Sequence, residues 1–108
     1  MKISNIFTIA ELPQGEKEIF ETLAKSKNVH IERIISSGQT TPQGEWYDSA
    51  QNEWVVLLQG EAHLETDDGQ TITLAQGDYI LIPAGQKHRV VYTSKDPYCI
   101  WLAIHFTP

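Results

Sequence analysis

The sequence contains only one cysteine, Cys99, among its 108 residues. An intramolecular disulfide is therefore impossible, and the fold must be held together by an apolar core. Cys99 lies within the apolar segment YCIWLAIHF, which contains no Lys or Arg. Because free cysteines are among the most buried residue types, we expect Cys99 to be a small core residue rather than a reactive thiol.

Basic residues are also scarce. Eight Lys and Arg stand against fourteen Asp and Glu, which gives a net charge of −6. Such a balance repels phosphate backbones, so we expect neither nucleic acid nor an anionic membrane surface as a partner. No apolar run approaches the roughly 20 residues of a membrane span, and the first residues lack the apolar run of a signal peptide. A cytoplasmic location is therefore expected.

The length of 108 residues suits one domain, 1–108, because a second core could not be filled. The first element is predicted in residues 16–25, which read EKEIFETLAK. Apolar side chains recur there at helical spacing, namely Ile19, Phe20, Leu23 and Ala24. This spacing predicts a short N-terminal helix near residues 16–25.

The chain from residue 29 to residue 106 has the pattern of short strands separated by turns. β-Branched and aromatic residues are frequent there, as in NEWVVLLQ, QTITLA and HRVVYTS. Asp68-Gly69 is a strong hairpin signal, since glycine adopts the positive φ that such turns require. Closely spaced hairpins predict an all-β fold, an antiparallel sandwich or closed barrel, over residues 29–106.

The last predicted strand, CIWLAIHF, is apolar on both faces. Trp101, Ala103 and His105 share one face, because side chains alternate along a strand. One face can fill the barrel interior, whereas the other needs a second sheet, the helix or a partner subunit. Since dimerisation is a common solution for such a small chain, we expect a homodimer.

The most informative segment is GDYILIPAGQKH, from Gly77 to His88. Five residues separate Gly77 from Pro83, one separates Pro83 from Gly85, and two separate Gly85 from His88. This spacing resembles the second conserved motif of the cupin superfamily, although Tyr92 stands where the family has Asn. The order is physically sensible, because Pro83 can end a strand and Gly85 can form the sharp turn before His88.

A second segment resembles the later half of the first cupin motif, with Glu53 followed by six residues and Gly60. In the family, two histidines that flank one residue precede this Glu, and three or four residues separate the second histidine from it. With four residues between, the two positions hold Trp46 and Asp48. With three, they hold Tyr47 and Ser49. The family's complete metal site of three His and one Glu therefore does not carry over.

The resemblance covers roughly residues 36–93. It implies a small double-stranded antiparallel β-barrel of the jelly-roll type, often homodimeric, with any ligand or metal at the barrel mouth. Activity does not follow from it, because cupins include dioxygenases, isomerases, epimerases, decarboxylases and binding proteins without catalytic activity.

A different metal set remains available. Asp48, Glu53 and His88 would supply two carboxylates and one imidazole, with His105 as a fourth donor if its face points inward. These donors suit a divalent Fe, Mn, Ni or Zn ion. The chain between Asp48 and Glu53 must then reverse or bulge, because five residues on one continuous strand would point them to opposite faces. Otherwise Glu53 is an exposed residue before a strand, and His88 is a hydrogen-bonded histidine at the barrel mouth.

Three aromatic residues are predicted either to line a ligand pocket or to pack in the core. They are Trp46, Tyr47 and Tyr92. His63 should face water, between inward-facing Ala62 and Leu64, and no role is expected for His30.

Three functions fit this sequence. The first is a metal-dependent enzyme acting on a small molecule. The second is a binding or sensor protein that holds a small polar ligand without metal, and the third is a metal-free enzyme with Glu53 or His88 as general acid or base. A metal ranks slightly ahead, because a polar trio inside an apolar barrel needs compensation. No fingerprint for phosphate or a nucleotide appears, so the substrate stays open.

Overall fold

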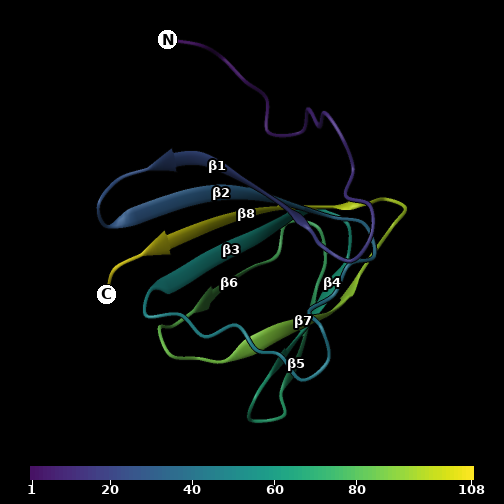
Figure 1. Cartoon of the computed structure of the whole chain (residues 1–108), viewed down its shortest axis with the longest axis vertical. Coiled ribbons are helices and arrows are strands. Elements are labelled where there is room, and N and C mark those ends of the chain that lie inside the picture. The colour runs from purple at the N-terminus through teal and green to yellow at the C-terminus, as the bar shows by residue number, and fades with distance from the viewer.

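The computed structural model describes residues 1–108 and contains eight β-strands and no α-helix (Figure 1). The strands are β1 (Ile19–Lys25), β2 (Val29–Ser36), β3 (Asn52–Gln59), β4 (Ala62–Thr66), β5 (Thr71–Leu74), β6 (Tyr79–Ile82), β7 (His88–Thr93) and β8 (Cys99–Phe106). One sheet has the order β1-β2-β8-β3-β6 and the other β5-β4-β7. All strand pairs are antiparallel, so the all-β prediction is confirmed. The structure holds no helix able to cross a membrane.

The predicted N-terminal helix is wrong. Ile19–Lys25 form the edge strand β1, which pairs along β2 and places Phe20 opposite Ile34. Pairing with β2 satisfies backbone groups that β2 would otherwise expose at the sheet edge, and this tertiary gain outweighs a short helical pattern. The helical spacing of four apolar residues was weak evidence for a helix, and two of them, Phe20 and Leu23, are 52% and 47% exposed in the strand.

The apolar core lies between the two sheets. It is formed by inward-facing side chains of both sheets: Ile34, Val55, Leu57, Ala62, Leu64, Leu74, Ile82, Val90, Cys99, Trp101 and Ala103. Cys99 is fully buried, as predicted, and its Sγ donates a hydrogen bond to the Glu61 carbonyl at 3.2 Å.

Strand β8 is the central strand of the larger sheet and carries both an inner and an outer apolar face. Trp101 and Ala103 point into the core, and His105 follows them on the same face. Leu102 and Ile104 point outward and are half-buried. Of the two apolar faces predicted for this strand, the one with Trp101, Ala103 and His105 therefore fills the barrel.

The turn between β6 and β7 sets the start of β7. The N–H of Gln86 donates to the Pro83 carbonyl at 3.1 Å, and Gly85 has a φ of +82°. The N–H of Gly85 donates to the Ser49 carbonyl at 2.8 Å, and the N–H of Ala84 donates to Asn52 Oδ1 at 2.9 Å. These bonds hold the segment before β3 against the turn that leads into His88.

The turn between β3 and β4 gives a stability test. Gly60 has a φ of +96°, and a Cβ there would lie 2.8 Å from Cys99 Sγ and 2.9 Å from Ser94 Oγ. We expect Gly60→Ala to lower the free energy of unfolding, measured by urea denaturation, by about 2 to 4 kcal/mol, from backbone strain plus overpacking.

Gly69→Ala is the matched control. Gly69 has a φ of +88° but open space where a Cβ would lie. Strain alone should then cost about 1 to 2 kcal/mol. Equal losses in the two variants would contradict the close approach of Gly60 to Cys99 and Ser94.

Candidate functional site

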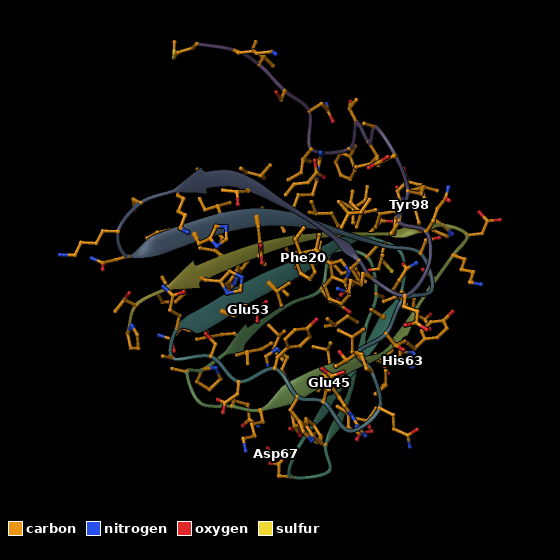
Figure 2. The ribbon with its side chains drawn as sticks, in the orientation of Figure 1. Phe20, Glu45, Glu53, His63, Asp67 and Tyr98 are labelled. Carbon is orange, nitrogen blue, oxygen red and sulfur yellow. The ribbon has the colours of Figure 1, made fainter.

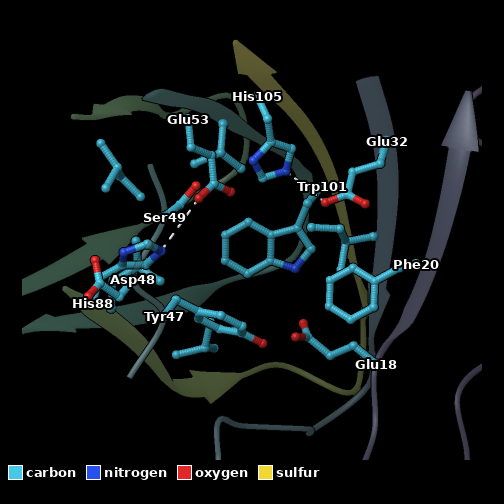
Figure 3. Close-up of a pocket in the computed structure, with 15 residues that line it drawn as sticks. Glu18, Phe20, Glu32, Tyr47, Asp48, Ser49, Glu53, His88, Trp101 and His105 are labelled. Atoms are coloured by element: carbon cyan, nitrogen blue, oxygen red, sulfur yellow. Dashed lines mark hydrogen bonds and ion pairs between the residues drawn. The ribbon is translucent and has the colours of Figure 1, made fainter. Parts of the chain in front are cut away.

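A cavity of about 170 Å³ opens between the two sheets (Figure 3). Its apolar lining comes from both sheets, with Ile34 and Val55 from the larger one and Leu64 and Val90 from the smaller one. Its polar side chains include Glu53 and His88 where β3 and β7 begin and His105 where β8 finishes. The cavity therefore combines an apolar interior with a polar mouth.

The register of the larger sheet places polar residues in one row. His105 of β8 is paired with Glu53 of β3 on one side and with His30 of β2 on the other. Directly opposed residues of neighbouring strands project from the same face of a sheet. Glu32 lies on this inner face as well, two residues from His30, so the row gathers carboxylates and imidazoles around the cavity.

His88 and Glu53 form the first polar pair. His88 Nε2 lies 3.5 Å from Glu53 Oε1, and both side chains are largely buried. His88 Nδ1 is 3.0 Å from the Gln86 carbonyl, which can only accept, so Nδ1 carries a proton and Nε2 faces Glu53. Burial alone would lower the pKa of His88, but Glu53 and the Gln86 carbonyl together raise it above its ordinary value.

His88 is positioned by its backbone as well as by its ring. The N–H of Tyr47 donates to the His88 carbonyl at 2.7 Å, and the N–H of His88 donates to the Tyr47 carbonyl at 3.1 Å. This isolated bridge ties the segment before β3 to the start of β7 and brings the two rings to 5.6 Å between centroids. Tyr47 consequently lines the same cavity as His88.

His105 and Glu32 form the second polar pair. His105 Nε2 and Glu32 Oε1 are 2.8 Å apart. The bond to Glu32 raises the pKa of His105 above its ordinary value, against the opposing effect of burial. His30 lies beside this pair, with its Nε2 2.9 Å from Thr22 Oγ1 and its ring 5.8 Å from that of His105.

Glu18 is a third, partly buried carboxylate in the cavity. Ser36 Oγ donates a hydrogen bond to Glu18, and Trp101 Nε1 donates to Ser36 Oγ at 2.9 Å. Burial raises the pKa of Glu18; the Ser36 bond opposes this, and the negative charges of Glu32 and Glu53 add to it. Burial and Glu18 likewise raise the pKa of Tyr47.

Glu18 and Glu32 were not among the residues singled out from the sequence. The alternation of His30, Glu32 and Ile34 along β2 could have indicated Glu32, because Ile34 belongs to the core and the three share one face. Glu18 lies within the segment 16–25 that was expected to be helical, so no strand face was assigned to it.

The four predicted metal ligands all line the cavity, so the chain does turn between Asp48 and Glu53 as expected. They do not form a donor cluster, since no group of three or more His, Cys, Asp or Glu side chains is placed to hold an ion. Nε2 of His105 is bound to Glu32, and Asp48 is exposed at the rim. Only Glu53 and His88 face each other, and this arrangement does not fit a metal centre.

Of the three predicted pocket aromatics, only Tyr47 lines the cavity. The ring of Trp46 lies under the guanidinium of Arg89, 4.5 Å from the ring centroid. The Tyr92 ring packs against that of His63, with centroids 4.7 Å apart and a tilt of 38°. His63 lies on a part of the barrel remote from Glu53 (Figure 2). The cause is a bulge in β7, where β4 pairs with Val90 and then with Tyr92, which turns Tyr92 outward and Thr93 inward.

Comparison with known proteins identifies relatives of this fold. A family model described as "Cupin domain" matches residues 34–105. A Ralstonia eutropha JMP134 protein, described as a candidate mannose-6-phosphate isomerase, is 40% identical over 100% of both chains, with a TM-score of 0.89. A cupin superfamily protein of Desulfitobacterium hafniense DCB-2 is 23% identical, covering 90% of this chain and 84% of its own, with a TM-score of 0.72; it supports the fold alone.

Two curated relatives are named as transcriptional regulators. AlkR of Acinetobacter baylyi, an HTH-type regulator, is 44% identical over 52 residues, which are 44% of this chain and 17% of AlkR. RclR of Escherichia coli, an HTH-type activator specific for RCS, is 36% identical over 47 residues, which are 44% of this chain and 16% of RclR. The matches thus span about a sixth of the length of these relatives.

The His88–Glu53 pair predicts a change in titration. In Glu53→Gln the charge that raises the pKa of His88 is lost while burial remains, so we expect this pKa to fall below its value in the unmodified protein, measured by NMR titration of the imidazole. The raised pKa stabilises the fold at pH values below the ordinary His pKa, and this stabilisation is lost as the pH rises through the raised pKa. The stabilisation should be smaller in the variant.

Glu61→Gln serves as the control, since Glu61 contacts His63 and does not line the cavity. It should leave the titration of His88 unchanged. An unaltered His88 pKa in Glu53→Gln would mean that the pair does not form in solution.

The donor arrangement predicts the metal content. We expect untagged protein purified without chelator to contain far less than one equivalent of Fe, Mn, Ni or Zn by elemental analysis, because the donors do not converge. The folded double variant Glu53→Ala, His88→Ala should give the same result. Near-stoichiometric metal that disappears in that variant would contradict this expectation and establish a metal site at the pair.

Proposed function

Since this chain belongs to the cupin family, we propose that it binds a small polar organic molecule inside its barrel. One observation carries the proposal. Two carboxylate–histidine pairs, Glu53–His88 and Glu32–His105, face one cavity whose remaining walls are largely apolar (Figure 3). Few convergent polar groups in an otherwise apolar cavity are typical of a ligand site.

The energetics of the two pairs support a role beyond stability. Placing an ion pair in an apolar interior costs several kcal/mol of desolvation per ion, so apolar residues of similar volume are often as stabilising. Both pairs nevertheless occupy the inner face, where Val55 and Ala103 of the neighbouring positions are plain core residues. A ligand that uses these polar groups would account for their presence.

The cavity volume limits the size of the ligand. A protein cavity of about 150 Å³ admits a benzene-sized molecule. The volume of about 170 Å³ therefore suits a compact molecule rather than a nucleotide or an oligosaccharide. An imidazole N–H can donate a hydrogen bond to it, and the carboxylates can accept hydrogen bonds from it.

The Glu53–His88 pair also favours a second candidate function, acid–base catalysis on the bound molecule. One member of such a pair can remove a proton while the other returns one, which is the chemistry of an isomerisation. The Ralstonia eutropha protein, similar over its whole length, is described as a candidate isomerase, and this supports the candidate. Exchange of ligand hydrogen with deuterated water would distinguish catalysis from binding alone.

Sensing is the alternative use of a ligand site without catalysis. The two curated relatives are regulators by name, although the matched segments are a small part of them. In that case, ligand binding in the cavity would change how the barrel contacts another protein or domain.

We also propose that a second copy of the chain covers the outer face of the larger sheet. Tyr79 and Leu81 of β6 are 67% and 54% exposed there, and the Trp54 ring lies 5.4 Å from that of Tyr79. Ile104 of β8, paired with Trp54, extends this apolar face. A homodimer would remove it from water.

Binding inside the barrel can be tested with a fragment library of equal numbers of cationic, neutral and anionic compounds. The reporter is the indole N–H NMR signal of Trp101, which lines the cavity, with Trp46 and Trp54 as internal controls that do not. We expect hits that shift the Trp101 signal alone. His88→Gln and His105→Gln should each change the affinity of these hits about tenfold, because each replaces a polar side chain of the cavity wall.

His63→Gln is the matched control, because His63 lies outside the cavity and should not affect affinity. A library that never shifts the Trp101 signal would refute the proposed function. Hits that bind equally well to both cavity variants would place the ligand elsewhere.

A further inference from the structure

We propose that the cavity selects small organic cations, such as primary or quaternary ammonium compounds, and rejects phosphorylated molecules. This inference rests on the proposed function, since it assigns the chemical class of the molecule that the cavity binds. It follows from the charge of the lining, from the aromatic walls and from the way in which Glu18 is held.

The charge of the lining is negative. Four carboxylates line the cavity, Glu18, Glu32, Asp48 and Glu53, and neither Lys nor Arg is present. The lining contains two side chains that can carry a positive charge, the imidazoles of His88 and His105. Even with both imidazoles protonated, the negative charges outnumber the positive ones.

The arginines of the chain are engaged away from the cavity. Arg33 makes a bidentate pair with Glu21, both bonds at 2.9 Å, and Arg89 pairs with Glu65 at 2.6 Å. A phosphate group is normally held by guanidinium or ammonium groups or by a row of backbone N–H groups. The Gly85 turn does not provide such a row, because the N–H groups of Ala84 and Gly85 are bonded to Asn52 and Ser49.

The aromatic walls complement a positive charge. Phe20, Tyr47 and Trp101 come from three separate segments and line one side of the cavity together, around Glu18 (Figure 3). The face of an aromatic ring attracts a cation, and sites for quaternary ammonium ligands are commonly built from several such rings. The indole N–H of Trp101 is taken up by Ser36, so its polar edge is satisfied and its ring remains available as a wall.

The carboxylate of Glu18 is held in place but has no positively charged partner. The Ser36 hydroxyl fixes one oxygen of its carboxylate, and no Lys or Arg pairs with it. Glu32 and Glu53 repel its charge, which contributes to its raised pKa. A bound ammonium group between these carboxylates would relieve this repulsion, whereas a phosphate would increase it.

A cavity that prefers cations does not suit the activity named for the Ralstonia eutropha relative. A mannose 6-phosphate molecule would bring a doubly charged anion toward four carboxylates. An enzyme with this cavity would therefore act on a molecule that carries an ammonium group.

The test compares two probes of nearly equal shape. Choline carries a permanent positive charge, and the neutral alcohol with a tert-butyl group in place of the trimethylammonium group does not. Affinities are measured by titrating the Trp101 indole signal of the full chain. We expect choline to bind about tenfold or more tightly than the alcohol, and mannose 6-phosphate not to shift the signal.

Variants connect the preference to the carboxylates. Glu18→Gln keeps the shape of the side chain and should weaken choline binding about tenfold while leaving the alcohol unaffected. Glu16→Gln, an exposed position two residues earlier, should change neither affinity. Unchanged Trp46 and Trp54 signals show that each variant is folded, and Glu32→Gln provides a second variant if Glu18→Gln does not fold.

The outcomes separate this inference from the proposed function. Equal affinity for choline and the alcohol, tighter binding of mannose 6-phosphate, or cavity hits from the fragment library that are mainly neutral or anionic would overturn the cation preference and leave ligand binding intact. If no probe and no library member shifts the Trp101 signal, the proposed function fails and the inference fails with it.

Discussion

The register of β8 against β2 and β3 determines which side chains enter the barrel. His105 is placed opposite Glu53 on one side and opposite His30 on the other, while Trp101 and Ala103 continue the same face into the core. A shift of one residue would turn this whole set to the outside of the sheet. Burial of Trp101 therefore holds His105 at the cavity, so that core packing and the polar site depend on the same pairing.

The polar site lowers the folding stability that a domain of this size can reach. Glu32 and Glu53 are brought close enough to Glu18 to repel its charge, in a cavity whose walls are largely apolar. The two histidines, Ser36 and the backbone carbonyl of Gln86 offset part of that cost through directed hydrogen bonds. Functional sites commonly retain such local destabilisation, and here it is supported by the surrounding antiparallel sheets.

One cupin barrel can support different chemistries because the scaffold and the lining are contributed by different residues. The turn with Pro83 and Gly85 and the position of His88 belong to the scaffold that this chain shares with its family. Glu18 directly precedes β1, Phe20 lies in β1 and Glu32 lies in β2. Their character sets the charge and shape of this particular cavity. Function must therefore be argued from the lining, not from the barrel.

The sequence by itself determined the strands of residues 29–106, the turn before His88, the burial of Cys99 and the meeting of Glu53 and His88 at one cavity. These features depend on local signals, namely alternation, turn-forming glycines and the spacing of one motif. Only the tertiary structure decided that residues 19–25 complete a sheet instead of forming a helix, and that a bulge at Val91 turns Tyr92 outward. It also decided that Glu18 and Glu32 join the site and that the four predicted ligands do not converge on one point. Such outcomes depend on pairing between segments distant in the chain, which no local pattern records.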